Sequence, residues 1–231
     1  TTFSLTHMRK IDLSIQEIPK GLLEDFLLAS AYLIGFKNEK LHGQKYVDGG
    51  VVDNFPINSL MERGYKDLIQ IRIYGPGGVA RAKLGEEVTV LEIAPKVKLG
   101  SIMDFQNKRS KQNLNMGYYD AKRMIYGLVG RIYYVEQTRE EWYYEKILEV
   151  LSDKEKAEVA FSLRMSRKSP NAEIYLTMLE ASAKLLRVPK YRVYTVEELE
   201  KEVYRRYKKN ENANKLPKFV HLLIALERGT E

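Results

Sequence analysis

The residues with the clearest chemical potential lie in the run KYVDGGVVDNFP, from Lys45 to Pro56. The pattern places a carboxylate, Asp48, at the end of a short strand. Gly49 and Gly50 follow it, and their backbone can turn sharply through φ values closed to other residues. A carboxylate on such a turn can project into a cleft and exchange a proton. Asp-Gly turns are also common as plain β-turns, and for a bare D-G-G the structural interpretation is favoured.

The other polar residues near this turn favour structural roles. Asp53 and Asn54 stand just before Pro56, which predicts that they cap the helix that follows. The chain has no cysteine, and its three histidines are far apart in the sequence. We therefore expect no cofactor, no metal site, no disulfide and no thiol nucleophile.

The elements that must position Asp48 follow an α/β order. Strand-like patterns and helix-like patterns alternate, and glycine or proline separates them. Strands are predicted within 2–15, 40–47, 68–73 and 88–93, and helices at 21–31 and 56–63. A strand, a helix and a further strand in this order are typical of an α/β unit with a parallel sheet.

Beyond Pro95 the pattern becomes helical. Leu114, Tyr118, Ala121 and Ile125 fall on one face of a helix that glycines close. Capping boxes (a hydroxyl, then a glutamate three residues later) are predicted at Ser152 with Glu155 and at Thr195 with Glu198. We place a domain boundary near residue 136, with an α/β portion at 1–135 and a small all-α domain at 136–231.

The full Asp48 block resembles the Y-[VI]-D-G-G-x-x-D-N-x-P run of the patatin-like phospholipase family. Three further segments are similar to that family: LASA at 28–31, MERG at 61–64 and GYYDA at 117–121. The last is similar to a bacterial subgroup with a helical C-terminal extension. The resemblance implies a three-layer α/β/α domain with a mostly parallel sheet. It also implies a Ser-Asp dyad in which Asp48 is the general base.

The family also needs a nucleophile that this chain does not contain. G-x-S-x-G and a glycine-rich oxyanion loop belong before the Asp block, and no serine here has that frame. The glycine-rich run at 75–78 follows Asp48 and is predicted to be a plain loop. We therefore expect the C-terminal part of a patatin-like serine acyl hydrolase that acts on phospholipids or other acyl esters. The chain alone should be inactive.

The net charge and the length of the longest apolar stretch limit the kinds of partner that the chain can bind. The net charge of +7 divides into +5 for residues 1–135 and +2 for 136–231, without a concentrated basic arm, so no nucleic-acid partner is expected. The longest apolar stretch, 27–36, is half of the roughly 20 residues that span a bilayer. A cytoplasmic protein that can lie peripherally on an anionic membrane fits these features. The alternative to the hydrolase is a non-catalytic lipid or membrane-surface binding module.

Two aromatic segments leave alternatives open. The run YRRYKK at 204–209 could touch phosphates or anionic lipid, but cations also suit the C-terminal end of a helix, and this structural interpretation is favoured. The run WYY at 142–144 is expected in the core or at a seam between domains, with a membrane-facing anchor as the less favoured interpretation.

Overall fold

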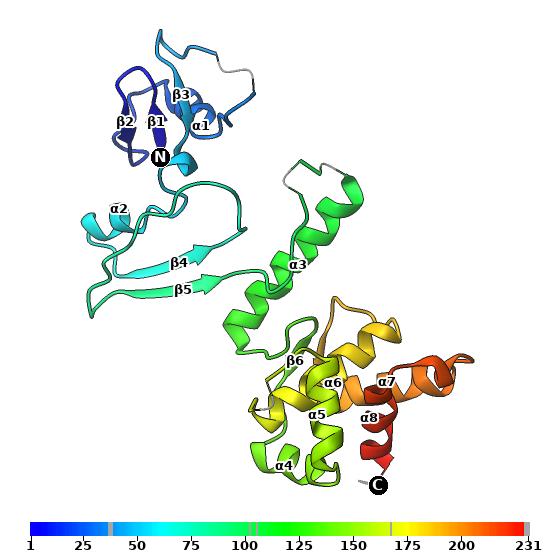
Figure 1. The fold of residues 1–231 in the computed structure, drawn as a ribbon. Helices are drawn as coiled ribbons and strands as arrows, with labels where there is room; N and C mark the ends of the chain where they lie inside the picture. Colours follow the sequence, from blue (N-terminus) through cyan, green and yellow to red (C-terminus); the bar gives the residue numbers. More distant parts are fainter. Residues whose placement is uncertain (37–38, 102, 105, 167, 229–231) are drawn as a thin grey trace. The chain divides into compact units, whose positions relative to one another are not determined.

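The computed structural model describes residues 1–36, 39–101, 103–104, 106–166 and 168–228 (Figure 1). Within these ranges the chain is a mixed α/β protein with eight α-helices and short strands. It divides into two compact units, Thr1–Ile93 and Ala94–Glu231. Among the helices of the described ranges, none has the length and apolar character needed to cross a bilayer.

Asp48 ends a strand of a small antiparallel sheet in the first unit. Strand β1 (Thr2–Ser4) lies between β2 (Arg9–Ile11) and β3 (Tyr46–Asp48), and it runs antiparallel to both. The resemblance implies a mostly parallel sheet for this domain, whereas the three strands that carry Asp48 pair antiparallel. The pairing is antiparallel because residues 5–8 turn β2 back along β1, and the returning chain places β3 on the other edge.

Helix α1 (Leu23–Ser30) is tied to this sheet through one buried hydroxyl. The Thr2 hydroxyl oxygen lies 3.0 Å from the Ala29 carbonyl oxygen and 2.8 Å from that of Val47. The 3₁₀ turn η1 (Gly49–Val51) follows β3 directly. The strands predicted within 2–15 and the helix predicted at 21–31 are confirmed, and together they fix the base of the Asp48 turn.

The rest of the first unit contains a parallel pair, but it does not join the two strands on either side of the helix predicted at 56–63. After α2 (Ile57–Glu62), strand β4 (Asp67–Ile71) pairs in parallel with β5 (Thr89–Ile93). On β4, Leu68 is buried, but Ile69 is 65% exposed and Ile71 68%. Parallel sheets are normally covered on both faces. The apolar side chains of Ile69 and Ile71 therefore form a surface on which further polypeptide could pack.

The second unit is built around helices and has its own core. In chain order its elements are α3 (Asn107–Tyr126), β6 (Tyr134–Glu136), α4 (Glu141–Glu149), α5 (Asp153–Ser162), α6 (Asn171–Leu185), β7 (Val193–Thr195), α7 (Val196–Lys208), the 3₁₀ turn η2 (Ala213–Lys215) and α8 (Lys218–Arg228). Helix α6 contacts α4, α7 and α8 (Figure 1). Tyr175, Met178 and Leu179 on it are fully buried.

The predicted all-α tail contains a short parallel sheet, which corrects that part of the fold prediction. Strands β6 and β7 pair over three residues each, and Tyr134, Val135 and Tyr194 on them are buried. Both predicted capping boxes are confirmed, at Ser152 with Glu155 and at Thr195 with Glu198.

The two units divide at Ile93 rather than near residue 136. Helix α3 belongs to the second unit because its Met116, Asp120 and Arg123 are buried there. The Tyr134 hydroxyl donates a hydrogen bond of 3.2 Å to Asp120. The helix predicted after Pro95 is confirmed, and it ends at Gly127 in the left-handed conformation.

Candidate active site

Asp48 is half-buried and held from two sides. Its backbone N–H donates to the Tyr32 carbonyl oxygen at 2.8 Å, and its Oδ1 accepts from the Gly50 N–H at 2.7 Å. Within the described part of the chain, the other carboxylate oxygen, Oδ2, has no hydrogen-bond partner. The turn thus orients one oxygen and leaves the other able to accept a proton.

Gly49 and Gly50 are required by space rather than by unusual φ values, which corrects the reason given for them from sequence. Neither is among the residues with positive φ. A Cβ atom on Gly49 would lie 2.6 Å from the Thr1 carbonyl oxygen, and one on Gly50 would lie 2.3 Å from Asn54 Oδ1. At Gly49 the obstacle is backbone, so a side chain there would push the Asp48 turn away from Thr1, whereas at Gly50 it would displace the Asn54 side chain.

The glycine-rich run at 75–78 lies against the Asp48 turn. The Gly78 N–H donates to the Gly50 carbonyl oxygen at 2.9 Å, and the Asn54 N–H donates to the Gly78 carbonyl oxygen at 2.8 Å. A Cβ atom on Gly77, whose φ is +139°, would lie 2.1 Å from the Gly50 oxygen. The loop at 75–78 therefore packs directly against the Asp48 turn and forms one side of the candidate site. Its place beside Asp48 depends on contacts across more than twenty residues, which no local pattern indicates.

Asp53 fastens the site and does not cap α2. The N-cap position of α2 is Pro56, without a side-chain cap. The Asp53 carboxylate instead accepts from the Phe55 N–H at 3.1 Å and the Ala80 N–H at 3.3 Å, and it pairs with Lys10 Nζ at 3.2 Å. Its side chain is only 3% exposed, and the ion pair and the two backbone donors offset the free-energy cost of burying this carboxylate.

Asn54 likewise does not cap α2. Its amide nitrogen donates to the Pro76 carbonyl oxygen at 3.2 Å, while its backbone N–H binds Gly78. The helix begins three residues further on, at Ile57, whose N–H donates to the Phe55 carbonyl oxygen. The two polar residues before Pro56 therefore join the Asp48 turn to the second glycine loop.

The structure also brings together a serine and an aspartate that sequence reasoning missed. The Ser59 hydroxyl donates to the Asp12 carboxylate, and Lys10 lies 3.6 Å from the same carboxylate. Burial opposes ionisation of Asp12, but the Ser59 hydrogen bond and the Lys10 charge outweigh it and lower the pKa of Asp12. A carboxylate stabilised in this way is a weak base, so the pair is suited to joining β2 to α2. No motif links positions so far apart.

No serine in the described ranges donates to Asp48. The described residues also hold no group of three or more histidine, aspartate or glutamate side chains that could bind a metal ion. The chemistry that Asp48 can perform from the described residues is therefore proton acceptance. A nucleophile would have to come from elsewhere.

The second unit buries an ion pair on the helix that carries GYYDA. Asp120 and Arg123 lie 2.6 Å apart, and the Arg123 guanidinium stacks 4.3 Å from the centre of the Tyr134 ring. Burial raises the pKa of the Asp120 carboxyl, against the opposing effects of Arg123 and Tyr134. Both partners lie on α3, and the helix is joined to the rest of the unit where the Tyr134 hydroxyl donates to Asp120 and Arg123 donates to the Tyr133 carbonyl oxygen.

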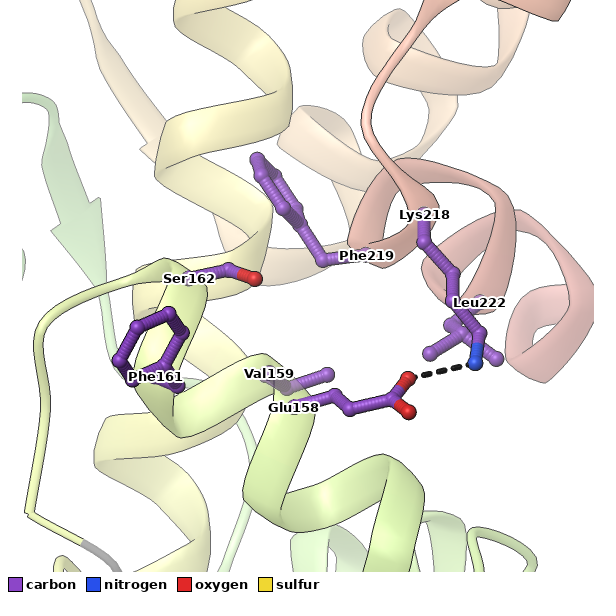
Figure 2. A pocket seen from close by; sticks show the side chains of 7 residues that line it. All are labelled: Glu158, Val159, Phe161, Ser162, Lys218, Phe219 and Leu222. Atoms are coloured by element: carbon purple, nitrogen blue, oxygen red, sulfur yellow. Dashed lines mark hydrogen bonds and ion pairs between the residues drawn. The ribbon is translucent and has the colours of Figure 1, made fainter.

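A small cavity of about 160 Å³ lies between α5 and α8 of the second unit. Figure 2 shows Phe161 and Phe219 beside it and the ion pair between Glu158 and Lys218, 2.5 Å apart, at one side. No residue of the predicted site lines it. Its walls are mostly apolar, and they bring no base to a nucleophile.

The aromatic segments at 142–144 and 204–209 make mostly contacts within the second unit. In the 142–144 run, Tyr144 is fully buried while Trp142 is 60% exposed. In the 204–209 run, Arg205 and Arg206 both pair with Glu202, and the Tyr207 hydroxyl lies 2.9 Å from His221 Nδ1.

The chain matches no protein-family model, no curated protein and no solved structure. The interpretation of the Asp48 turn therefore depends on its residues and their geometry.

Proposed function

We propose that this chain is the Asp-bearing part of a patatin-like serine acyl hydrolase, with a patatin-like α/β/α domain completed by polypeptide outside these 231 residues. The single observation that carries the proposal is the Asp48 turn. One carboxylate oxygen is fixed by the Gly50 N–H at 2.7 Å, and the other has no partner in the described ranges. The resemblance of the block from Lys45 to Pro56 to the family motif supports it. So do the solvent-exposed apolar side chains of β4 and β5.

In the proposed reaction Asp48 is the general base. It accepts the hydroxyl proton of a serine as the serine oxygen bonds to the carbonyl carbon of an acyl ester. The bond to the alcohol then breaks, and the alcohol takes the proton from Asp48. Water, deprotonated by Asp48, finally cleaves the acyl-serine bond, and the serine regains a proton. The substrate class is a phospholipid or another acyl lipid.

The test is esterase activity of the complete protein with short acyl esters. Asp48→Asn should lower turnover by about 10²- to 10⁴-fold, because it removes the proton acceptor while the Asn side chain can keep the hydrogen bond from Gly50. Asp25→Asn is the matched control, since Asp25 lies in the same unit and pairs with the exposed His42. Turnover that is unchanged in Asp48→Asn would contradict the dyad. The 231-residue chain alone should not react with a serine-directed fluorophosphonate.

A second candidate function is a non-catalytic lipid or membrane-surface binding module. It is favoured by the observation that no serine of the described ranges contacts Asp48. The two candidates differ in the residues that accompany this chain in the complete protein. A G-x-S-x-G serine there supports the hydrolase, and a replaced serine supports the binding module.

A further inference from the structure

Helix α3 exposes an apolar stripe to solvent within its unit. Leu114 is 74% exposed, Tyr118 57% and Ile125 64%, and the helical period places all three on one side. The opposite side holds the buried Met116 and Asp120. Large apolar side chains that line up on the outer face of a helix indicate a surface that binds another partner.

The exposed side of α3 carries only positive charge. The helix has five basic residues, and Asp120, its one acidic residue, is buried and paired with Arg123. Lys111 and Lys122 lie beside the stripe, within about 60° of its centre on the helical circumference. Residues 94–135 as a whole hold eight basic and two acidic residues, a net charge of +6 in a chain of +7.

We infer that α3 binds the surface of an anionic phospholipid bilayer, with Leu114, Tyr118 and Ile125 in the interface and Lys108, Lys111 and Lys122 beside lipid phosphates. A basic helix with an apolar face is the usual form of a surface-bound membrane helix. Tyrosine favours the boundary between lipid headgroups and acyl chains. The centre of the Tyr118 ring lies 5.1 Å from Lys122 Nζ, so the helix presents an aromatic ring and a positive charge together.

A second copy of this chain is a less suitable partner for the stripe. A twofold contact uses the same patch on both subunits, so it would bring the same lysines together. Like charges at an interface cost free energy, and this helix has no exposed carboxylate to offset them. Anionic lipid supplies the complementary charge along the whole helix.

The inference extends the lipid proposal above, but its test does not involve Asp48. A failure of vesicle binding and a failure of catalysis are therefore separate results. Because the chain has no cysteine, single cysteines can carry an environment-sensitive dye. Leu114→Cys reports on the stripe. Phe161→Cys, on α5, is the matched control because Phe161 is also highly exposed.

With vesicles of phosphatidylcholine and 30% phosphatidylserine, the dye at 114 should shift to shorter wavelength while the dye at 161 should not. Phosphatidylcholine alone should give little binding, and raised salt should weaken the binding to anionic vesicles. The triple variant Lys108→Gln, Lys111→Gln, Lys122→Gln should lose about fivefold in partition for each lysine.

The charge control is a triple variant of exposed lysines on the other helices, Lys146→Gln, Lys154→Gln, Lys201→Gln. Equal loss in both triple variants would overturn the inference, because only net charge would then matter. Equal binding to neutral vesicles would also overturn it. So would a cysteine at 114 that is protected from maleimide without lipid, or an α3-dependent dimer, since protein would then cover the stripe.

Discussion

Glu180 holds a backbone loop in the second unit, and its removal should be among the most destabilising single changes in this unit. Its carboxylate is buried on α6 and accepts from the N–H groups of Arg131 (2.9 Å), Ile132 (2.8 Å) and Tyr133 (2.7 Å). A Cβ atom on Gly130 would lie 2.5 Å from the same carboxylate. The loop is therefore shaped around one negative charge.

The expected magnitude follows from these contacts. Each hydrogen bond to a charged group contributes about 1.5–3 kcal/mol, and a buried donor left without a partner costs about 1–3 kcal/mol. Arg131 is exposed, so its N–H can bind water, whereas Tyr133 is buried and cannot. Glu180→Ala should therefore lower the free energy of unfolding of the helical unit by about 3–5 kcal/mol. Glu180→Gln, which keeps one acceptor oxygen, should cost less.

The assay is urea unfolding followed by the fluorescence of Trp142, the only tryptophan of the chain, which lies on α4 of this unit. Amide hydrogen exchange at Ile132 and Tyr133 gives a local measurement. Glu149→Ala, at the exposed end of α4, is the control and should change stability by less than about 0.5 kcal/mol. A Glu180→Ala loss below about 1 kcal/mol with unchanged exchange at these amides would refute the reasoning.

Three further predictions concern strain, charge and capping. Gly77→Ala puts a methyl group 2.1 Å from a backbone oxygen, so it should lower the free energy of unfolding by at least about 1–3 kcal/mol, measured by thermal unfolding. Gly85→Ala, with open space around it, is the control and should be near neutral. Equal effects of the two substitutions would contradict the close approach at Gly77. The hydrogen bond from Arg205 lowers the pKa of Glu202 to about 2. The ionised Glu202 therefore stabilises the folded state fully above about pH 4.5, and this contribution is lost as the pH falls toward 2. A midpoint near 4.5 for Glu202 in an NMR titration would be the contrary result. Ser152→Ala should cost about 1 kcal/mol in urea unfolding, and a full-length α5 of unchanged stability would argue against the capping box.

Local patterns predicted the elements well because their causes lie within a few residues. Each capping box joins a hydroxyl to a backbone N–H three residues later, so Ser152 and Thr195 mark the starts of their helices through local contacts. A parallel sheet was predicted from a strand, a helix and a further strand, but the strands on either side of α2, β3 and β4, lie in different sheets. The parallel pair that does form joins β4 to β5, with no helix between them. Asp48 was also placed correctly at the end of a strand.

The surroundings of Asp48 could be predicted only in part. Asp53 has the sequence of a helix cap, but its carboxylate binds Lys10 and the Ala80 N–H, which are 43 and 27 residues away. The run at 75–78 looks like a plain loop until Gly78 is seen to bind Gly50. Such contacts depend on which loops the sheet brings together, and residue types at short spacing do not encode that choice.

By itself the sequence determined the two capping boxes, the strand end that carries Asp48 and the charge of the region around α3. The tertiary structure decided which faces are buried. Periodicity placed Leu114 and Tyr118 on one side of α3, yet the helix packs through Met116, Asp120 and Arg123. The physical reason is that Asp120 and Arg123 neutralise each other and meet the Tyr134 ring and hydroxyl, so this polar side can be buried once β6 supplies its partners.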